Sequence, residues 1–337
     1  MRIGLIGSGS WGTALAKMLT DNGHDLIWCV RSSAVADYIR KRHHNPKYLS
    51  SVYFGQQNLL LTSDPAEVYG QVSVVVLAVP SAHVEQYLLP YHNKWPADLC
   101  IVSAVKGMMP GKNCLINDYL HTELHVNPRN YFTIMGPCHA EEVAAEKLSY
   151  LTFAGLDKDL TTSIAGLFSS TYLNTVVSQD VQGVQYAAVL KNIYALGAGI
   201  AHGLGYGDNF LSVLIANAAG ELKRFLTRLC SSTKNGIDPI QSIDYAASVY
   251  LGDLLVTCYS LFSRNRAFGN LIGKGYAVDA AKQDMHMVAE GYPASKALFE
   301  LNKTYAAEMP IAHAVYSILW EGADPRNAFE KLEASLM

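Results

Sequence analysis

The sequence predicts an α/β protein in which a doubly wound sheet over residues 1–180 precedes an all-helical domain over residues 181–337. Two observations predict this division. Through the first part, short apolar runs alternate with helical stretches, and several runs are apolar at consecutive positions, as in parallel strands covered on both faces. After Asp180 no strand pattern remains, and segments rich in Ala, Leu and Gly have helical spacing.

Eight apolar runs are the predicted strands: 2–6, 25–30, 58–62, 73–79, 99–104, 131–135, 149–154 and 172–177. Helical stretches lie between them, and this alternating order is typical of a doubly wound sheet. In the helical part, turn residues over 229–243 predict a loop or a break between helices.

The first predicted strand runs directly into a glycine-rich turn. Gly7, Gly9 and Gly12 have the G-x-G-x-x-G spacing, with a strand before them and a predicted helix from Thr13 after them. Such glycines allow a tight turn, the approach of a pyrophosphate to the backbone, and close packing of helix on strand. We therefore expect a Rossmann-like domain that binds a dinucleotide.

The composition excludes several other classes of protein. The net charge of −3 provides no general attraction to nucleic acid or to an anionic membrane. No segment approaches eighteen uncharged apolar residues, so we expect no membrane span, and the N-terminus lacks the plan of a signal peptide. The six cysteines form no C-x-x-C pair and no spacing typical of a metal site. A cytoplasmic protein without a metal is expected.

Two basic residues follow predicted strands at the edge of the sheet where ligands bind. Arg31 stands at the end of the second strand, where NAD-specific proteins usually carry an acidic residue that binds the adenosine ribose. The arginine should therefore tolerate or favour a 2′-phosphate, unless it is only a solvated surface residue. Lys106 follows the fifth strand and is a candidate for contact with the substrate or the nicotinamide.

The helical part contains a lysine in an unusual setting. Lys191 is the only charged residue between Val184 and Ala201. Lysine is rarely buried without a partner, and desolvation lowers its pKa towards the range useful for proton transfer. Asp253, also in apolar surroundings, is the obvious partner. A lysine that extends along an apolar helix towards solvent is the alternative interpretation.

A polar group follows the segment of Asp253. Ser263, Arg264 and Asn265 offer a hydroxyl, a guanidinium and an amide in consecutive positions. This combination suits a phosphate monoester because charge-assisted hydrogen bonds to its oxygens are strong and directional. A solvated polar turn is the alternative.

Eight segments of the chain, in order, are distinctive together: GSGSWGTALA at 7–16, NPKYL at 45–49, AVPS at 78–81, Lys106-Gly107, MGPCHAEEVA at 135–144, LKNIYALGAGIAHGLGYGDN at 190–209, LGDLLVTCYSLFSRNRAFG at 251–269 and VAEGY at 288–292. Through these segments the chain resembles the bacterial-type NAD(P)-dependent glycerol-3-phosphate dehydrogenases over nearly its whole length. The resemblance implies reversible hydride transfer between NAD(P)H and dihydroxyacetone phosphate, supplying sn-glycerol 3-phosphate for phospholipid synthesis. It also implies a small-molecule substrate and a homodimer.

The resemblance also implies roles for residues. Lys191 would be the proton acceptor, oriented by Asp253, and Lys106 would contact both ligands. The implied substrate-binding residues are Lys106, Gly136, Cys138, Lys191, Asp253, Ser263, Arg264 and Asn265. The implied cofactor-binding residues are Gly7, Gly9, Ser10, Trp11, Gly12, Arg31, Lys106, Ala140, Arg264, Val288 and Glu290.

The chain departs from the family pattern near the expected pocket. Cys138 stands where a hydroxyl residue is usual, and a thiol is a weaker hydrogen-bond donor. The segments 216–220 and 246–250 also differ from the usual stretches. A β-hydroxyacid or 6-phosphogluconate-type dehydrogenase is the alternative enzyme, although Ser263–Asn265 favours phosphate over carboxylate. A non-catalytic NAD(P)-sensing homologue is the alternative from another class, although Lys106, Lys191 and Asp253 are intact.

Overall fold

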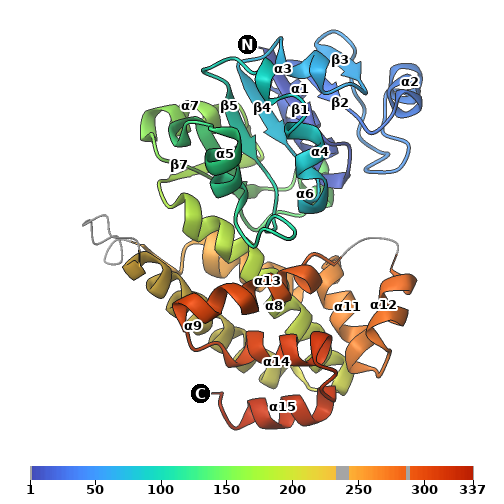
Figure 1. Ribbon diagram of the computed structural model, residues 1–337. Helices are drawn as coiled ribbons and strands as arrows, with labels where there is room; N and C mark the ends of the chain where they lie inside the picture. Colours follow the sequence, from blue (N-terminus) through green and yellow to red (C-terminus); the bar gives the residue numbers. More distant parts are fainter. Residues whose placement is uncertain (1, 233–242, 286–288, 337) are drawn as a thin grey trace. The chain divides into compact units, whose positions relative to one another are not determined.

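The computed structural model describes residues 2–232, 243–285 and 289–336. The chain divides into two compact units. The first, here called the sheet unit, comprises Met1–Met109 and Cys114–Gln182; the second, the helical unit, comprises Pro110–Asn113 and Gly183–Met337 (Figure 1).

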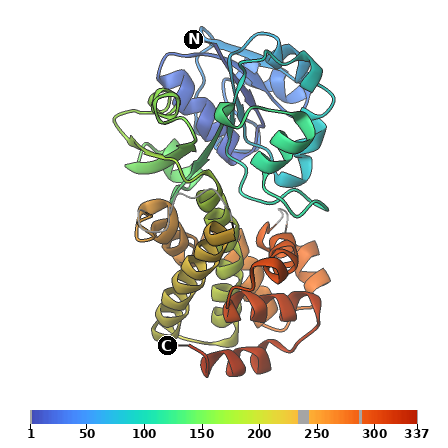
Figure 2. The same cartoon turned by 60° about the vertical axis from the view of Figure 1, so that its left-hand side comes forward.

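The sheet unit contains one eight-stranded sheet with helices on both faces (Figures 1 and 2). Its strands lie in the order β3-β2-β1-β4-β5-β6-β7-β8. Their bounds are β1 Arg2–Ile6, β2 Asp25–Cys29, β3 Leu59–Thr62, β4 Val74–Leu77, β5 Cys100–Ser103, β6 Tyr131–Met135, β7 Ser149–Gly155 and β8 Leu173–Ser178. All eight predicted runs are strands, and the predicted α/β class is confirmed.

The helices of this unit are α1 Ser10–Asp21, α2 Ser33–Arg42, α3 Ala66–Tyr69, α4 Val84–Leu88, α5 Ile116–Leu124, α6 Ala140–Ala144 and α7 Lys158–Gly166. Large buried rings fill the core beside the sheet, among them Trp28, Phe54 and Phe132.

One strand pair differs from a purely parallel sheet. β7 pairs antiparallel with β6, while β8 returns parallel to β7. The chain between β6 and β7 contains only the five-residue α6. A helix of that length rises less than 10 Å and cannot carry the chain back along a strand, so the connection favours antiparallel pairing.

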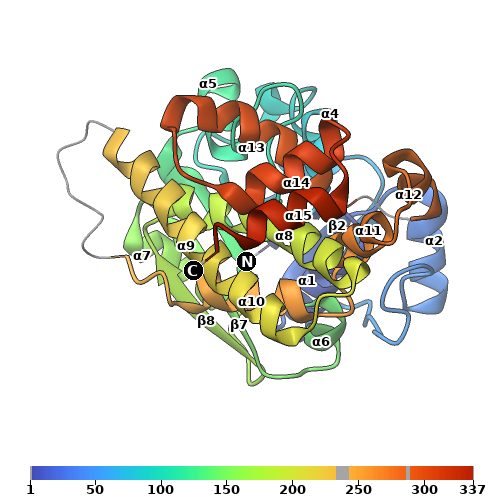
Figure 3. The ribbon, with the colours of Figure 1, turned by 90° about the horizontal axis from the view of Figure 1, so that it is seen from below.

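The helical unit is built around two long helices, α8 Val181–Leu204 and α9 Asp208–Ser232 (Figure 3). The others are α10 Asp253–Tyr259, α11 Arg264–Gly273, α12 Val278–Asp284, α13 Gly291–Tyr305, α14 Pro310–Trp320 and α15 Pro325–Glu333. The loop predicted over 229–243 is wrong at its start, because α9 continues to Ser232. Leu229 is buried there, and burial of an apolar side chain outweighs the turn preference of its neighbours. Residues 233–242 lie outside the described residues.

A buried carboxylate connects two helices of this unit. Glu221 on α9 is fully buried and accepts hydrogen bonds from the backbone N–H groups of Ile311 and Ala312, in the first turn of α14. Burial raises the pKa of Glu221 to about 7, and these two hydrogen bonds oppose the rise. Glu221 thus serves as the cap that α14 cannot supply from its own first residues.

This raised pKa predicts a pH dependence of stability. Between the unfolded pKa of 4.5 and the folded value of about 7, the native state binds more protons at Glu221, so stability falls as pH rises through that window. Glu221→Gln should remove this contribution, which is at most about 3 kcal/mol. Chemical denaturation of both proteins from pH 5 to 8 measures the difference, and parallel pH profiles would contradict the prediction.

Candidate functional site

The glycine-rich loop lies where the strand order reverses. β1 pairs with β2 on one side and β4 on the other, and the loop follows β1 at the carboxyl end of the sheet. Gly7 has a φ of 120°, and a Cβ there would lie 2.2 Å from the carbonyl oxygen of Ala78. A Cβ on Gly9, in contrast, would meet nothing within 4 Å. The backbone at Gly9 therefore faces space that a pyrophosphate can approach, which fits a dinucleotide.

Arg31 lies beside this loop. Its backbone N–H donates to Ser8 Oγ at 3.2 Å, and the residue is exposed at the end of β2. The guanidinium is thus available to a charged group bound next to the loop.

Lys106 also lies near the glycine-rich loop. Its Nζ is 5.6 Å from the centre of the Trp11 ring, and Trp11 is in the first turn of α1. This cation–π contact joins two predicted cofactor residues from different strand ends. Ser10 opens α1, so Ser10, Trp11 and Lys106 occupy one edge of the sheet.

The segment after β6 is held against β7. Gly136 has a φ of 142°, and a Cβ there would lie 2.9 Å from the carbonyl oxygen of Tyr150. The thiol of Cys138 donates to the same carbonyl, with Sγ 3.1 Å from the oxygen. Its hydrogen is therefore directed into the sheet unit. Ala140 is buried as the first residue of α6.

The helical unit contains a buried ion pair. Lys191 on α8 and Asp253 on α10 are 4 % and 1 % exposed, and Lys191 Nζ donates to Asp253 Oδ1. Asp253 Oδ2 has no hydrogen-bond partner among the described residues. Thr257, one turn later, donates its hydroxyl to the Asp253 carbonyl at 2.6 Å. A buried Lys–Asp pair with a spare acceptor can bind a polar group and exchange a proton with it.

A junction of amides lies one residue further along α8. Asn265 Nδ2 donates to Asn192 Oδ1 at 2.9 Å, and Asn265 Oδ1 accepts from the backbone N–H of Gly291 at 2.9 Å. Asn265 therefore connects α8, α11 and α13. Sequence reasoning did not select Asn192 or Thr257, although Asn192 adjoins the only charge in its segment.

The expected phosphate-binding residues open α11. Ser263 is the N-cap residue and accepts from the N–H of Arg266, and Arg264 is the first residue of the helix. Of the expected cofactor residues in the helical unit, Glu290 immediately precedes α13, while Val288 lies outside the described residues.

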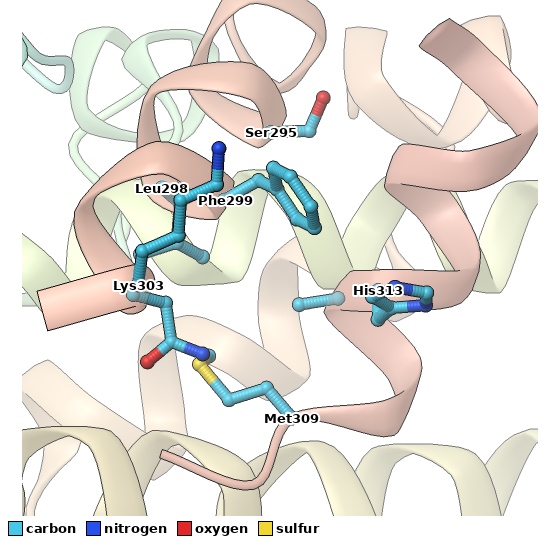
Figure 4. Close-up of a pocket in the computed structure, with 8 residues that line it drawn as sticks. Ser295, Leu298, Phe299, Lys303, Met309 and His313 are labelled. Atoms are coloured by element: carbon cyan, nitrogen blue, oxygen red, sulfur yellow. The ribbon is translucent and has the colours of Figure 1, made fainter. Parts of the chain in front are cut away.

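A separate cavity of about 200 Å³ lies between α13 and α14 (Figure 4). Two of its polar groups have partners within the unit: Lys303 pairs with Glu300, and Ser295 accepts from the indole of Trp320. Neither Lys191 nor Asp253 lines this cavity.

Comparison with known proteins identifies the family. The N-terminal domain of NAD-dependent glycerol-3-phosphate dehydrogenase matches residues 2–161, and the C-terminal domain of the same enzymes matches residues 180–330. The chain belongs to the NAD-dependent glycerol-3-phosphate dehydrogenase family. The family's two domain matches contain the glycine-rich loop and the Lys191–Asp253 pair, respectively.

Individual relatives agree. The chain is 34 % identical to glycerol-3-phosphate dehydrogenase [NAD(P)+] of Halalkalibacterium halodurans over 98 % of this chain and 93 % of that protein. It is also 34 % identical to the enzyme of Bacillus velezensis, over 99 % and 94 %. The crystal structure of glycerol-3-phosphate dehydrogenase from Coxiella burnetii has a TM-score of 0.87 and 28 % identity, covering 98 % of each chain. No described helix is long and apolar enough to cross a membrane.

Proposed function

We propose that this chain interconverts sn-glycerol 3-phosphate and dihydroxyacetone phosphate with NAD(P)H as the hydride carrier. The buried Lys191–Asp253 pair carries the proposal, because reduction of a ketone requires a proton donor in a site without bulk water. When bound, NAD(P)H supplies the hydride. The sequence resemblance and the family membership support the substrate.

In the proposed reaction Lys191 is the group that donates and accepts the proton. During reduction its ammonium donates a proton to the carbonyl oxygen at C2, and during oxidation its amine accepts the hydroxyl proton. Asp253 orients Lys191 through Oδ1, and the spare Oδ2 is an acceptor for a substrate hydroxyl. Lys106, Gly136 and Cys138 are also proposed to contact the substrate.

The phosphate is assigned to the start of α11. Ser263, Arg264 and Asn265 supply donors there, and the helix N-terminus favours an anion. Arg264 is proposed to be shared between substrate and cofactor. The remaining cofactor contacts are Gly7, Gly9, Ser10, Trp11, Gly12, Arg31, Lys106, Ala140, Val288 and Glu290. We assign cofactor binding to residues 1–180 and substrate binding to residues 181–337, in a cytoplasmic homodimer that feeds phospholipid synthesis.

A cofactor-oxidation assay tests this function. Purified protein should oxidise NADPH or NADH when dihydroxyacetone phosphate is added, and should not do so with 3-oxo acids, the oxidised forms of β-hydroxy acids. Activity only with the acids would favour the β-hydroxyacid dehydrogenase alternative. Cofactor binding without oxidation of cofactor by any phosphorylated ketone would favour the sensing homologue.

Arg31 predicts the choice between the two cofactors. Arg31→Ala should raise the KM for NADPH by about 10-fold or more while the KM for NADH changes little, because a charge-assisted bond to a 2′-phosphate is worth about 1.5–3 kcal/mol. Arg42→Ala, which removes another exposed arginine from the nearby α2, is the control. Equal changes in the KM values for NADPH and NADH would show that Arg31 does not bind the 2′-phosphate.

A further inference from the structure

Three carbonyl groups of the glycine-rich loop, those of Gly7, Ser8 and Gly9, each accept a hydrogen bond from another part of the sheet unit. The indole Nε1 of Trp28 donates to Gly7 O at 2.8 Å, and Asn45 Nδ2 donates to Ser8 O at 3.1 Å. The Gly9 carbonyl accepts from both the backbone N–H and the hydroxyl of Thr13, each at 2.9 Å. The same Asn45 Nδ2 also donates to that hydroxyl at 2.9 Å, so one amide supports two of the three carbonyls.

This arrangement determines where the N–H groups of the loop point. In a trans peptide the carbonyl and the following N–H point in opposite directions. No peptide bond of the described chain is cis. Holding the carbonyls of Gly7, Ser8 and Gly9 therefore turns the N–H groups of Ser8, Gly9 and Ser10 the opposite way, away from Trp28 and Asn45. These are N–H groups of the loop that we assign to the pyrophosphate.

Both donors are held by one loop, residues 43–54, in which Asn45, Val52 and Phe54 are buried. Its ends are joined by a hydrogen bond from Phe54 N to His43 O at 2.7 Å. The Phe54 ring packs on Trp28 with their centres 5.1 Å apart. Asn45 is 1 % exposed, and its Oδ1 accepts from the N–H groups of Lys47 and Tyr48 at 3.0 and 3.3 Å. Compact loops with joined ends are frequently functional.

We propose that Asn45 and Trp28 are positioning residues that orient the peptide N–H groups of the glycine-rich loop before the cofactor arrives. The proposal rests on the assignment of this loop to the cofactor. Neither side chain needs to touch the cofactor. Their contribution is to cofactor affinity, because a loop with free carbonyls must lose rotational freedom when the pyrophosphate binds.

Binding calorimetry with NADPH in the absence of substrate tests the proposal. Asn45→Asp keeps the oxygen that binds Lys47 and Tyr48 but removes the donor to Ser8 O; it should raise the Kd about 10-fold. Trp28→Phe keeps a ring against Phe54, removes the indole donor to Gly7 O, and adds no charge; it should raise the Kd about 5-fold. The KM for dihydroxyacetone phosphate should stay within about twofold in both variants, since only cofactor binding is affected.

Asn22→Asp is the matched control. Asn22 Nδ2 also donates to two backbone carbonyls of the sheet unit, those of Leu167 and Ser169, but at the opposite end of α1. The Asn22→Asp variant should have a lower thermal stability and an unchanged Kd for NADPH.

Three outcomes would overturn the proposal. Asn45→Asp and Trp28→Phe could both lose thermal stability while keeping the Kd of the wild type, which would make them structural residues only. Weaker binding in Asn45→Asp alone would assign the effect to the added charge. If Asn45→Asp does not fold, an unchanged Kd for NADPH in Trp28→Phe is sufficient to overturn the proposal. A wild-type protein that binds neither NADPH nor NADH would instead refute the cofactor assignment itself.

Discussion

Replacing Lys191 by alanine is expected to lower kcat for reduction of dihydroxyacetone phosphate by about 10²- to 10⁴-fold, the usual contribution of a general acid. Binding of NADPH should be largely retained, because the expected contacts of the dinucleotide lie mainly in the sheet unit. Steady-state kinetics and a calorimetric titration with NADPH measure the two effects. Retention of more than about a tenth of the wild-type rate would remove Lys191 from this role.

Two further variants separate chemistry from folding. Lys191→Ala leaves the Asp253 carboxylate buried without its cation, which commonly costs about 3–5 kcal/mol, so the folded fraction must be measured. Lys191→Arg keeps a cation opposite Asp253 but cannot release its proton near neutral pH, and it should also be inactive. Lys223→Ala, which removes an exposed lysine from α9, is the control and should remain active.

Replacing Gly269 by alanine is expected to produce the largest structural effect. α8 and α11 cross at glycines: a Cβ on Gly269 would lie 2.1 Å from Leu196 O, and one on Gly199 would lie 2.1 Å from Arg266 O. Both neighbours are backbone atoms, so the helices must separate. We expect a loss of roughly 1–3 kcal/mol or more in the free energy of unfolding.

This separation should also reduce activity. α8 carries Lys191 and α11 begins with Arg264, so the crossing sets the spacing between the proposed proton donor and the proposed phosphate-binding residues. The KM for dihydroxyacetone phosphate should rise in Gly269→Ala at temperatures where the variant is folded.

Gly220→Ala is the matched control for this prediction. Gly220 lies inside α9, and a Cβ there would meet only the end of the Arg224 side chain, at 3.3 Å. Because alanine is the better helix former, this variant should gain up to about 1 kcal/mol. Equal thermal stability of the Gly269 and Gly220 variants would show that α8 and α11 accommodate the added methyl group without a loss in the free energy of unfolding.

The sequence predicted the strands better than the connections between them. Consecutive apolar residues such as Val74–Leu77 mark a buried strand without reference to the rest of the chain. The direction of β7 could not be read in this way, because it depends on how far the chain between β6 and β7 can reach. The end of α9 was also missed, since burial of Leu229 is a property of its neighbours in space.

In the candidate site, too, local features could be predicted from the sequence, whereas contacts between distant residues mostly could not. By itself the sequence determined the glycine-rich turn, its strand and its helix, and it singled out Lys191 and Asp253, because these signals are local in spacing or stand out against apolar surroundings. The pairing of Lys191 with Asp253, 62 residues away, was expected from the sequence and is confirmed, whereas only the tertiary structure decided that Asn45 donates to a carbonyl 37 residues before it. The physical reason is that a buried polar group must find its partner wherever packing brings one, and no spacing along the chain records that distance.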